Sequence, residues 1–207
     1  MRRLPSIDAC QRMKSEHRQI LQDLFLLAQP PWNTAGSPVV ALQDAGKRAR
    51  AQGLVVLELG MQAQGEAREL ASVLAAIARQ GVREGRAAAP TVILSGGPVC
   101  LSGRETGAAS FLLMLALALD AHPAIHALAI GGASGGQTPA DGQGRGWAGF
   151  VAPDTLARAQ QQGLQAAPML ASGRAADFFE ALGDQIRIER WPAEGAATVV
   201  LRAVLLV

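Results

Sequence analysis

The amino-acid sequence predicts a layered α/β fold with a mostly parallel sheet, and three observations support this class. Apolar strand-like segments alternate with amphipathic helical segments along most of the 207 residues. Several of the strand-like segments are compact apolar runs of the kind found in buried strands. Two of them lead directly into glycine-rich segments, and ligands of open α/β sheets bind beyond the carboxyl ends of the strands.

The N-terminal part of the chain contains two predicted helices and one strand. Residues Ser15 to Gln29 carry apolar side chains at helical spacing until two prolines stop the pattern. The Pro-rich segment that follows is predicted to be a linker. A second helix is predicted from Ser37 to Gln52, ended by Gly53, with the strand LVVLEL after it. We therefore divide the chain into an N-terminal helical appendage with its linker, residues 1–36, and one main α/β domain, residues 37–207.

The alternation continues to the C-terminus. The segment Phe111 to Leu119 is a continuous apolar run, but it is much shorter than the roughly 20 residues of a membrane-spanning helix. It therefore predicts a buried helix and no membrane span. The other predicted elements are a helix in QGEARELASVLAAIARQG, a strand TVILS that enters a turn at Gly96-Gly97, a strand HALAI, helices near Pro153 and over Ala175 to Leu182, and closing strands QIRI and TVVLRAVLLV.

Composition excludes several classes of protein. Apolar residues make up 49% of the chain, which is typical of a globular protein and not of a disordered one. The 19 basic and 17 acidic residues nearly cancel and the arginines are scattered, so no nucleic-acid partner is expected. The N-terminus has no apolar core of a signal peptide, which predicts a cytoplasmic protein with reduced thiols at Cys10 and Cys100.

The G-x-G-x-x-G pattern of Gly144, Gly146 and Gly149 lacks the context of a dinucleotide site. That fingerprint follows a strand directly, opens a helix and has an acidic residue about 20 positions on. Here the preceding strand ends near Ile130, and Met169 occupies the distal position. A P-loop is also excluded, because no glycine turn of the chain contains a lysine.

Neither a zinc site nor a nucleophilic serine is predicted. His122 and His126 are four residues apart, but Pro123 between them breaks the helix that would bring them together. Ser95 follows a strand, yet it lacks the preceding G-x of a nucleophile elbow and an evident histidine partner. The glycines after it fit a simple tight turn and an anion-binding turn equally well, since glycine serves both uses.

The two glycine segments are expected to share one crevice. Ser95-Gly96-Gly97 and Gly131-Gly132 each follow a strand, so both belong at the carboxyl end of the sheet. Backbone N–H groups of two such turns would form a shallow pocket for a weakly bound anion. No lysine or metal-holding carboxylate is expected beside it.

Seven segments, taken in order, resemble the C-terminal half of the bacterial glycerate 2-kinases. These proteins contain a MOFRL domain and have often been labelled hydroxypyruvate reductases. The order of several unrelated segments makes this resemblance, over residues 39–207, more specific than any single glycine motif. The segments are VVALQDAGKRARAQGLVVLELGMQAQGEARELASVLAAIARQG, PTVILSGG, FLLMLALAL, HALAIGG, GFVAPDTLARAQQQGL, DFFEALGD and LRAVLLV.

The resemblance implies a protein whose relatives have two domains. In that family ATP and a 2-hydroxy acid bind in the cleft between a large N-terminal domain and the MOFRL domain. HRQILQDLFLLAQ resembles the family's opening helix, and PPWNTAGSP stands where nearly the whole large domain would be. The resemblance therefore implies that half of the cleft is missing.

Polar motifs of the family are altered in this chain. GRETGAAS keeps Gly103 and Arg104 of the family's G-R-G-G-R-N-Q-E but loses its R-N-Q-E group. Ala133 replaces the first aspartate of G-T-D-G-x-D-G-P, and Asp141 is the one acid left in that stretch. WPAEGAATVV replaces T-G-P-T-x-T-N-V-N-D, so that Val200 and its neighbours supply no asparagine or aspartate.

These losses predict a pseudoenzyme that acts by binding or association. Phosphoryl transfer requires cations near the phosphates and carboxylates that hold Mg²⁺, and both are largely gone from the matching positions. We predict no catalytic residue, metal site or cofactor. The vestigial ligand-binding residues are Ser95, Gly96, Gly97, Arg104, Gly131, Gly132, Ser134 and Asp141. The alternative is a glycerate kinase using ATP and Mg²⁺ whose site is completed by another chain.

Absence of the large domain would expose an apolar surface, which a soluble protein seldom leaves in water. The apolar face of the first helix is the available cover, either within one chain or across a symmetric homodimer. We favour the homodimer because the double-proline linker is short and stiff, and a partner protein is the other option. The residues of that face are Ile20, Leu21, Leu24, Phe25 and Leu27.

Overall fold

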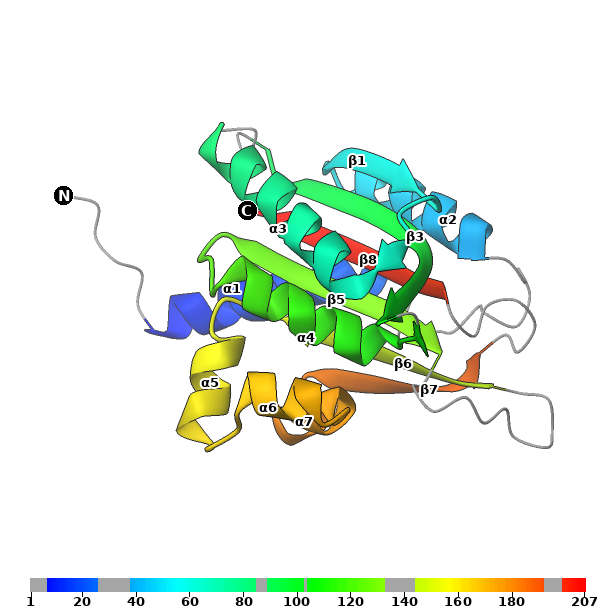
Figure 1. Cartoon of the computed structure of the whole chain (residues 1–207). Helices are drawn as coiled ribbons and strands as arrows, with labels where there is room; N and C mark the ends of the chain where they lie inside the picture. Colours follow the sequence, from blue (N-terminus) through cyan, green and yellow to red (C-terminus); the bar gives the residue numbers. More distant parts are fainter. Residues whose placement is uncertain (1–6, 26–37, 85–88, 103, 133–143, 192–198) are drawn as a thin grey trace.

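A computed structural model describes residues 7–25, 38–84, 89–102, 104–132, 144–191 and 199–207 (Figure 1). A twisted sheet forms the centre, and helices lie on both of its faces. In chain order the elements are α1 (Ile7–Leu24), α2 (Pro38–Ala51), β1 (Val55–Gly60), β2 (Gly65–Glu66), α3 (Ala67–Arg83), β3 (Thr91–Leu101), β4 (Arg104–Glu105), α4 (Ala108–Leu119), β5 (Ile125–Gly132), β6 (Gly144–Val151), α5 (Thr155–Gln161), α6 (Ala166–Ala171), α7 (Ala175–Ala181), β7 (Gln185–Trp191) and β8 (Val199–Leu206).

The sheet is mixed and mostly antiparallel, so the prediction of a mostly parallel sheet is wrong. Its main strands lie in the order β1-β3-β8-β5-β6-β7. β1 pairs with β3 in parallel, whereas the β3–β8, β8–β5, β5–β6 and β6–β7 pairs are all antiparallel. The short strands β2 and β4 extend the end of β3, in parallel and antiparallel orientation respectively.

The C-terminal strand explains this difference. β3 and β5 run in the same direction and are connected through α4, as the helix and strand alternation predicts. β8, however, inserts between them and runs against both, which makes two antiparallel pairs in the centre of the sheet. The local sequence of β8 predicts a buried strand, but it carries no information on which neighbours that strand takes.

A second correction concerns the glycine-rich segment after the predicted strand HALAI, in which the sequence analysis expects no strand. Its C-terminal part, GRGWAGFV, is the strand β6, which pairs with β5 and β7. The helix predicted over Ser37 to Gln52 is confirmed as α2, and Gly53 follows it with a φ of 78°, in the left-handed region that glycine adopts readily. The short helix α6 was not predicted.

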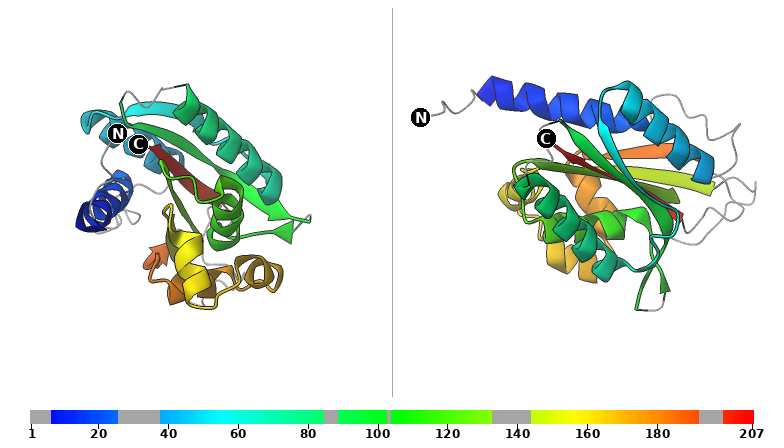
Figure 2. Two further views of the ribbon diagram at one scale, coloured as in Figure 1. Left: turned by 90° about the vertical axis from the view of Figure 1, so that its left-hand side faces the viewer. Right: turned by 90° about the horizontal axis from the view of Figure 1, so that it is seen from above.

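The two faces of the sheet bury separate apolar clusters because side chains alternate along each strand. Figure 2 shows α3 and α4 on one face and α1 and α2 on the other. α4 is buried on nearly every side, since α3, β5, β6, α6 and α7 all contact it. This environment explains its continuous apolar sequence, and among the described residues no helix is both long and apolar enough to span a membrane.

The first helix covers the α2 face of the sheet within the same chain. Leu21, Leu24 and Phe25 are each at most 1% exposed and pack in one cluster with residues of α2, β5 and β8. These three residues therefore cover an apolar face of the sheet within the same chain, while the favoured homodimer through this helix stays a prediction. Ile20 packs at the edge of the cluster, and Leu27 lies outside the described residues.

Replacement of Leu24 by alanine tests how much this docking contributes to stability. Leu24 is fully buried, so Leu24→Ala should lower the free energy of unfolding by about 2–5 kcal/mol, through lost burial and the cavity left behind. Chemical denaturation measures this change. The matched control is Gln19→Ala on the exposed side of α1, which should change stability by less than about 0.5 kcal/mol. Equal effects of the two variants would contradict the docking of α1.

Candidate functional site

The candidate site lies at one end of the sheet, where the glycines of β3 and β5 flank the first residues of β8. Leu201 of β8 is paired with Gly96 on one side and with Ile130 on the other. The two predicted glycine segments are therefore at the same end of the sheet, as expected, but β8 separates them. Two strand spacings amount to about 10 Å, so the segments flank β8 and do not contact each other directly.

The predicted turn at Gly96-Gly97 does not exist, because β3 continues through both glycines to Leu101. Ser95 is paired with Gly60 of β1 and with Arg202 of β8, and the glycines are paired with the next residues of β8. Backbone groups that would form an anion-binding turn belong instead to a strand ladder. The assignment of these residues as ligand contacts stays a prediction.

Position 97 has to be a glycine because the segment between β1 and β2 passes close to it. Its φ is 143°, a conformation that residues with a side chain rarely adopt. A Cβ atom at this position would lie 2.8 Å from the carbonyl oxygen of Ala63 and 2.9 Å from that of Met61. The absence of a side chain thus allows the segment between β1 and β2 to approach the strand closely.

A charged residue that the sequence analysis missed, Arg202, occupies the centre of this site. Its side chain is fully buried and lies over the Phe111 ring, with its guanidinium carbon 4.8 Å from the ring centroid. Nη1 donates a hydrogen bond to the Ala63 carbonyl oxygen (2.8 Å), and Nη2 donates one to the Gly97 carbonyl oxygen (2.6 Å). The guanidinium therefore joins β8 to β3 and to the segment above β3.

Burial dominates the electrostatics of Arg202. Desolvation lowers its pKa to about 10, so the group still carries a proton at neutral pH. Among the described residues, its Nε atom and the Oγ atom of Ser95, the residue opposite it in the ladder, have no hydrogen-bond partner. No salt bridge to Arg202 is found in the described part of the chain. Buried carbonyl oxygens compensate the charge here, which is unusual because buried charges normally pair with an opposite charge.

The structure describes only some of the other predicted site residues. Gly131 approaches β8 and the start of α4 closely, since a Cβ atom there would lie 3.1 Å from the Val199 carbonyl oxygen and 3.2 Å from Ala108 Cβ. Gly132 ends β5, and the backbone of Arg104 pairs with Leu101 in the short β3–β4 ladder. Ser134 and Asp141 lie outside the described residues.

The G-x-G-x-x-G glycines have a packing role at one position. A Cβ atom on Gly149 would lie 2.1 Å from the nearest ring carbon of Trp147, two residues earlier in the same strand. The indole therefore fills the space over Gly149, and its Nε1 donates a hydrogen bond to Gln185 Oε1 (2.8 Å). This arrangement agrees with the sequence-based conclusion that the pattern is not a dinucleotide fingerprint.

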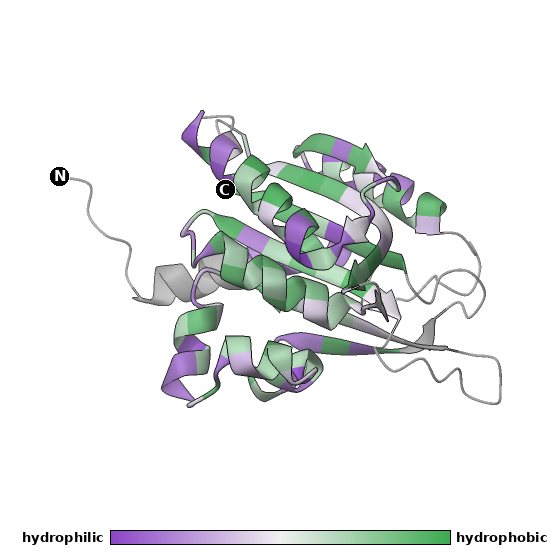
Figure 3. Cartoon of the chain, viewed as in Figure 1, coloured by the Kyte–Doolittle hydropathy of each residue, from purple (hydrophilic) through white to green (hydrophobic). Residues whose placement is uncertain are grey.

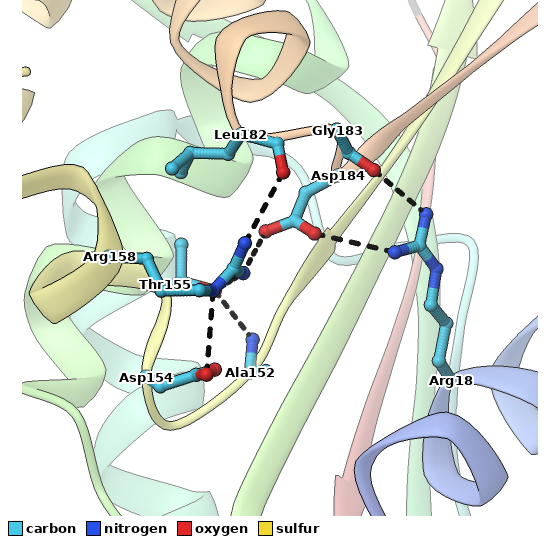
Figure 4. A network of polar contacts seen from close by, with 8 residues as sticks. All are labelled: Arg18, Ala152, Asp154, Thr155, Arg158, Leu182, Gly183 and Asp184. Carbon is cyan, nitrogen blue, oxygen red and sulfur yellow. Dashed lines mark hydrogen bonds and ion pairs between the residues drawn. The ribbon is translucent and has the colours of Figure 1, made fainter. Parts of the chain in front are cut away.

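A second polar cluster fixes α1 against the far strands of the sheet (Figure 4). Asp184, which precedes β7, forms ion pairs with Arg158 of α5 and with Arg18 of α1, the latter at 3.4 Å. Arg18 also donates to the Gly183 carbonyl oxygen (3.2 Å) and lies over the Phe150 ring. Burial raises the pKa of Asp184, and the hydrogen bond from Arg158 opposes that shift.

Two histidines form another contact of α1. His17 Nδ1 lies 3.0 Å from Nε2 of His126, a buried residue of β5, and the two rings meet edge to face. His122, which lies four residues before His126 in the sequence, accepts a hydrogen bond on Nδ1 from the backbone N–H of Ala124 (3.3 Å). In the described residues no group of three or more His, Cys, Asp or Glu side chains is arranged to hold a metal ion.

Comparison with curated proteins identifies the relatives of this chain. A protein of Agrobacterium vitis described as "Putative hydroxypyruvate reductase" is 36% identical over 157 residues, which are 72% of this chain and 35% of the relative. A second protein of that organism with the same description is 34% identical over 157 residues and 40% of its length. This chain thus shows partial homology to these two proteins described as putative hydroxypyruvate reductases. It spans little more than a third of the length of these two relatives.

Solved structures support the family's fold. The Thermotoga maritima glycerate kinase matches 81% of this chain and 40% of its own chain, with a TM-score of 0.62 and 20% identity. A Pyrococcus horikoshii protein matches with a TM-score of 0.59 and 16% identity, over 38% of its own chain. The resemblance inferred from the sequence motifs is thus confirmed, although no family model matches the chain. At these identities the structural likeness concerns the fold alone.

The His17–His126 contact predicts that acid weakens the docking of α1. Burial lowers the pKa of His17 below its ordinary 6.5, and Glu16 opposes this shift. The unfolded chain therefore binds a proton at a higher pH than the folded chain does. The contribution of His17 to stability is complete above pH 6.5 and decreases as the pH falls below that value.

Chemical denaturation above and below pH 6.5 measures this effect. The matched variant is His17→Gln, which keeps an amide in reach of His126 but does not titrate. The parent should lose more stability on acidification than the variant does. An equal loss in both proteins would show that protonation of His17 is not linked to folding.

Proposed function

We propose that this chain is a noncatalytic relative of the glycerate kinase and hydroxypyruvate reductase proteins, and that it acts by binding or association. One observation carries the proposal. Arg202 of β8 lies between β3 and β5, the two strands that carry the glycines. It is fully buried and donates two hydrogen bonds to backbone carbonyl oxygens. A cation in this state is not available to a phosphate that arrives from solvent.

The altered motifs support the same proposal. Phosphoryl transfer depends on positioned cations and on carboxylates that hold a metal ion. Where the family resemblance places such groups, this chain has Ala133, Ala197 and Val200. Val200 is buried in the apolar cluster on the α4 face, so at that position a packed side chain replaces a polar one. The core is maintained while the polar chemistry of the site is reduced.

Assays of the full chain with Mg²⁺, ATP and D-glycerate test the proposal. We expect no glycerate-dependent formation of ADP and no saturable heat of binding, at concentrations at which the Thermotoga maritima glycerate kinase turns over. NADH should likewise not be consumed with hydroxypyruvate, because the chain has no complete dinucleotide fingerprint.

Glycerate-dependent ADP formation would contradict the proposal, provided that it belongs to this chain and not to a contaminant. The variant Arg104→Ala, at a predicted ligand residue, and the variant Arg187→Ala, at an exposed arginine of β7, make this distinction. Activity that is lost in Arg104→Ala and kept in Arg187→Ala would establish a working site and would favour the kinase alternative.

A further inference from the structure

The edge strand β1 carries an uncovered row of apolar side chains. Val55, Leu57 and Leu59 are 52%, 42% and 36% exposed, although they stand in a strand of the central sheet. Figure 3 shows β1 as a largely hydrophobic strand at the boundary of the fold. Natural proteins usually protect such edges with charges, proline or a covering element, so a hydrophobic edge strand is a site at which another strand can add.

The register with β3 places Val55 and Leu57 on one face of the sheet, and it shifts between Glu58 and Gly60, so that Leu59 stands at an irregularity of the strand. Val55 is opposite Thr91 and Leu57 is opposite Ile93, a residue of the cluster on the α4 face. Val56 points to the other face and packs against the cluster that α1 and α2 cover. The docking of α1 in cis thus covers one face of the sheet and leaves the exposed row of β1 uncovered.

The backbone of β1 offers hydrogen-bonding groups on its outer side. The Val55 N–H donates to the Pro90 carbonyl oxygen (3.0 Å), so this residue directs its backbone groups toward β3. Backbone groups alternate in direction along a strand, which means that Val56 and Glu58 direct theirs away from β3. Among the described elements β1 has β3 as its sheet neighbour and forms one end of the strand order.

We propose that a second copy of this chain pairs with β1 in antiparallel orientation, about a two-fold axis at Leu57. In this register Val56 of one copy is opposite Glu58 of the other, and these pairs exchange about four backbone hydrogen bonds. Leu57 is opposite its own counterpart, and Val55 is opposite Leu59. The exposed apolar side chains of the two copies, centred on the two Leu57 residues, then come together across the joined sheets.

Charge selects this register over its neighbour. An axis at Glu58 would satisfy the same backbone groups, but it would place two glutamates directly opposite each other, which is destabilising. With the axis at Leu57, each Glu58 is opposite an apolar residue and keeps its ion pair with Arg50 (3.4 Å) on the α2 side of the sheet. The edge is therefore complementary to itself with the axis at Leu57.

The self-complementary edge favours a second copy over an unrelated strand, because a two-fold contact satisfies both edges with the same residues. One short strand from each chain makes a small interface, and small interfaces belong to weak complexes. The dimer should therefore form at high protein concentration and dissociate on dilution. This inference does not depend on the proposed lack of catalysis, since an active kinase could pair in the same way.

Sedimentation velocity of the full chain, from low micromolar to near-millimolar concentration, tests the inference. The parent should move from monomer to dimer, and Leu57→Lys should remain a monomer with an unchanged melting temperature. Val73→Lys is the matched control, because Val73 is 54% exposed but belongs to α3 and not to the edge strand, so this variant should dimerise like the parent. A parent that stays monomeric throughout, or a Val73→Lys variant that loses the dimer as Leu57→Lys does, would overturn the inference.

Cross-linking tests the register separately from the stability of the variants. Opposed residues of a non-hydrogen-bonded antiparallel pair have Cα atoms about 4.5 Å apart, within the range of a disulfide. Leu57→Cys should therefore form a covalent dimer under mild oxidation, and Val73→Cys should not exceed the background of the parent cysteines. Cross-linking of both variants to the same extent, or of neither, would contradict the proposed pairing.

Discussion

The buried guanidinium of Arg202 is the constraint on which the centre of this structure depends. It lies in the strand between β3 and β5 and holds the carbonyl oxygens of Gly97 and Ala63, which belong to a neighbouring strand and to the segment that crosses above it. Burial of a charge costs free energy, so the fold has to maintain both carbonyl contacts and the contact with the Phe111 ring. The missing side chain of Gly97 allows the close approach that makes this possible.

This constraint connects the fold to its proposed loss of chemistry. A site at the carboxyl ends of strands needs donors that face an open crevice. Here the backbone of Ser95 and its following glycines belongs to the β3 ladder, and the cation between the strands is used internally. The family's framework is thus compatible with a protein that recognises partners through its surface. The exposed strand β1, at one end of the same sheet, provides such a surface.

Local signals in the sequence predicted the elements that depend on local chemistry. Gly53 after α2 and the uniform apolar run of α4 are examples, and the buried face of α1 was found from its periodicity. The insertion of β8 between β3 and β5 could not be predicted, because strand order depends on distant contacts. β6 was missed because glycine suggests a loop, whereas Gly149 accommodates the Trp147 indole. Arg202 did have a signal, since it is the one charge in the apolar segment TVVLRAVLLV.

The accessibility of Arg202 to a guanidinium-specific reagent such as phenylglyoxal, followed by peptide mass spectrometry, tests the central claim most directly. Arg174 and Arg187 are internal references, because their side chains are 62% and 72% exposed. In the folded protein these two arginines should be modified while Arg202 remains unmodified, and denaturant should make all three reactive. Modification of Arg202 in the folded protein at the rate of Arg174 would show that its guanidinium is open to solvent and would contradict the account.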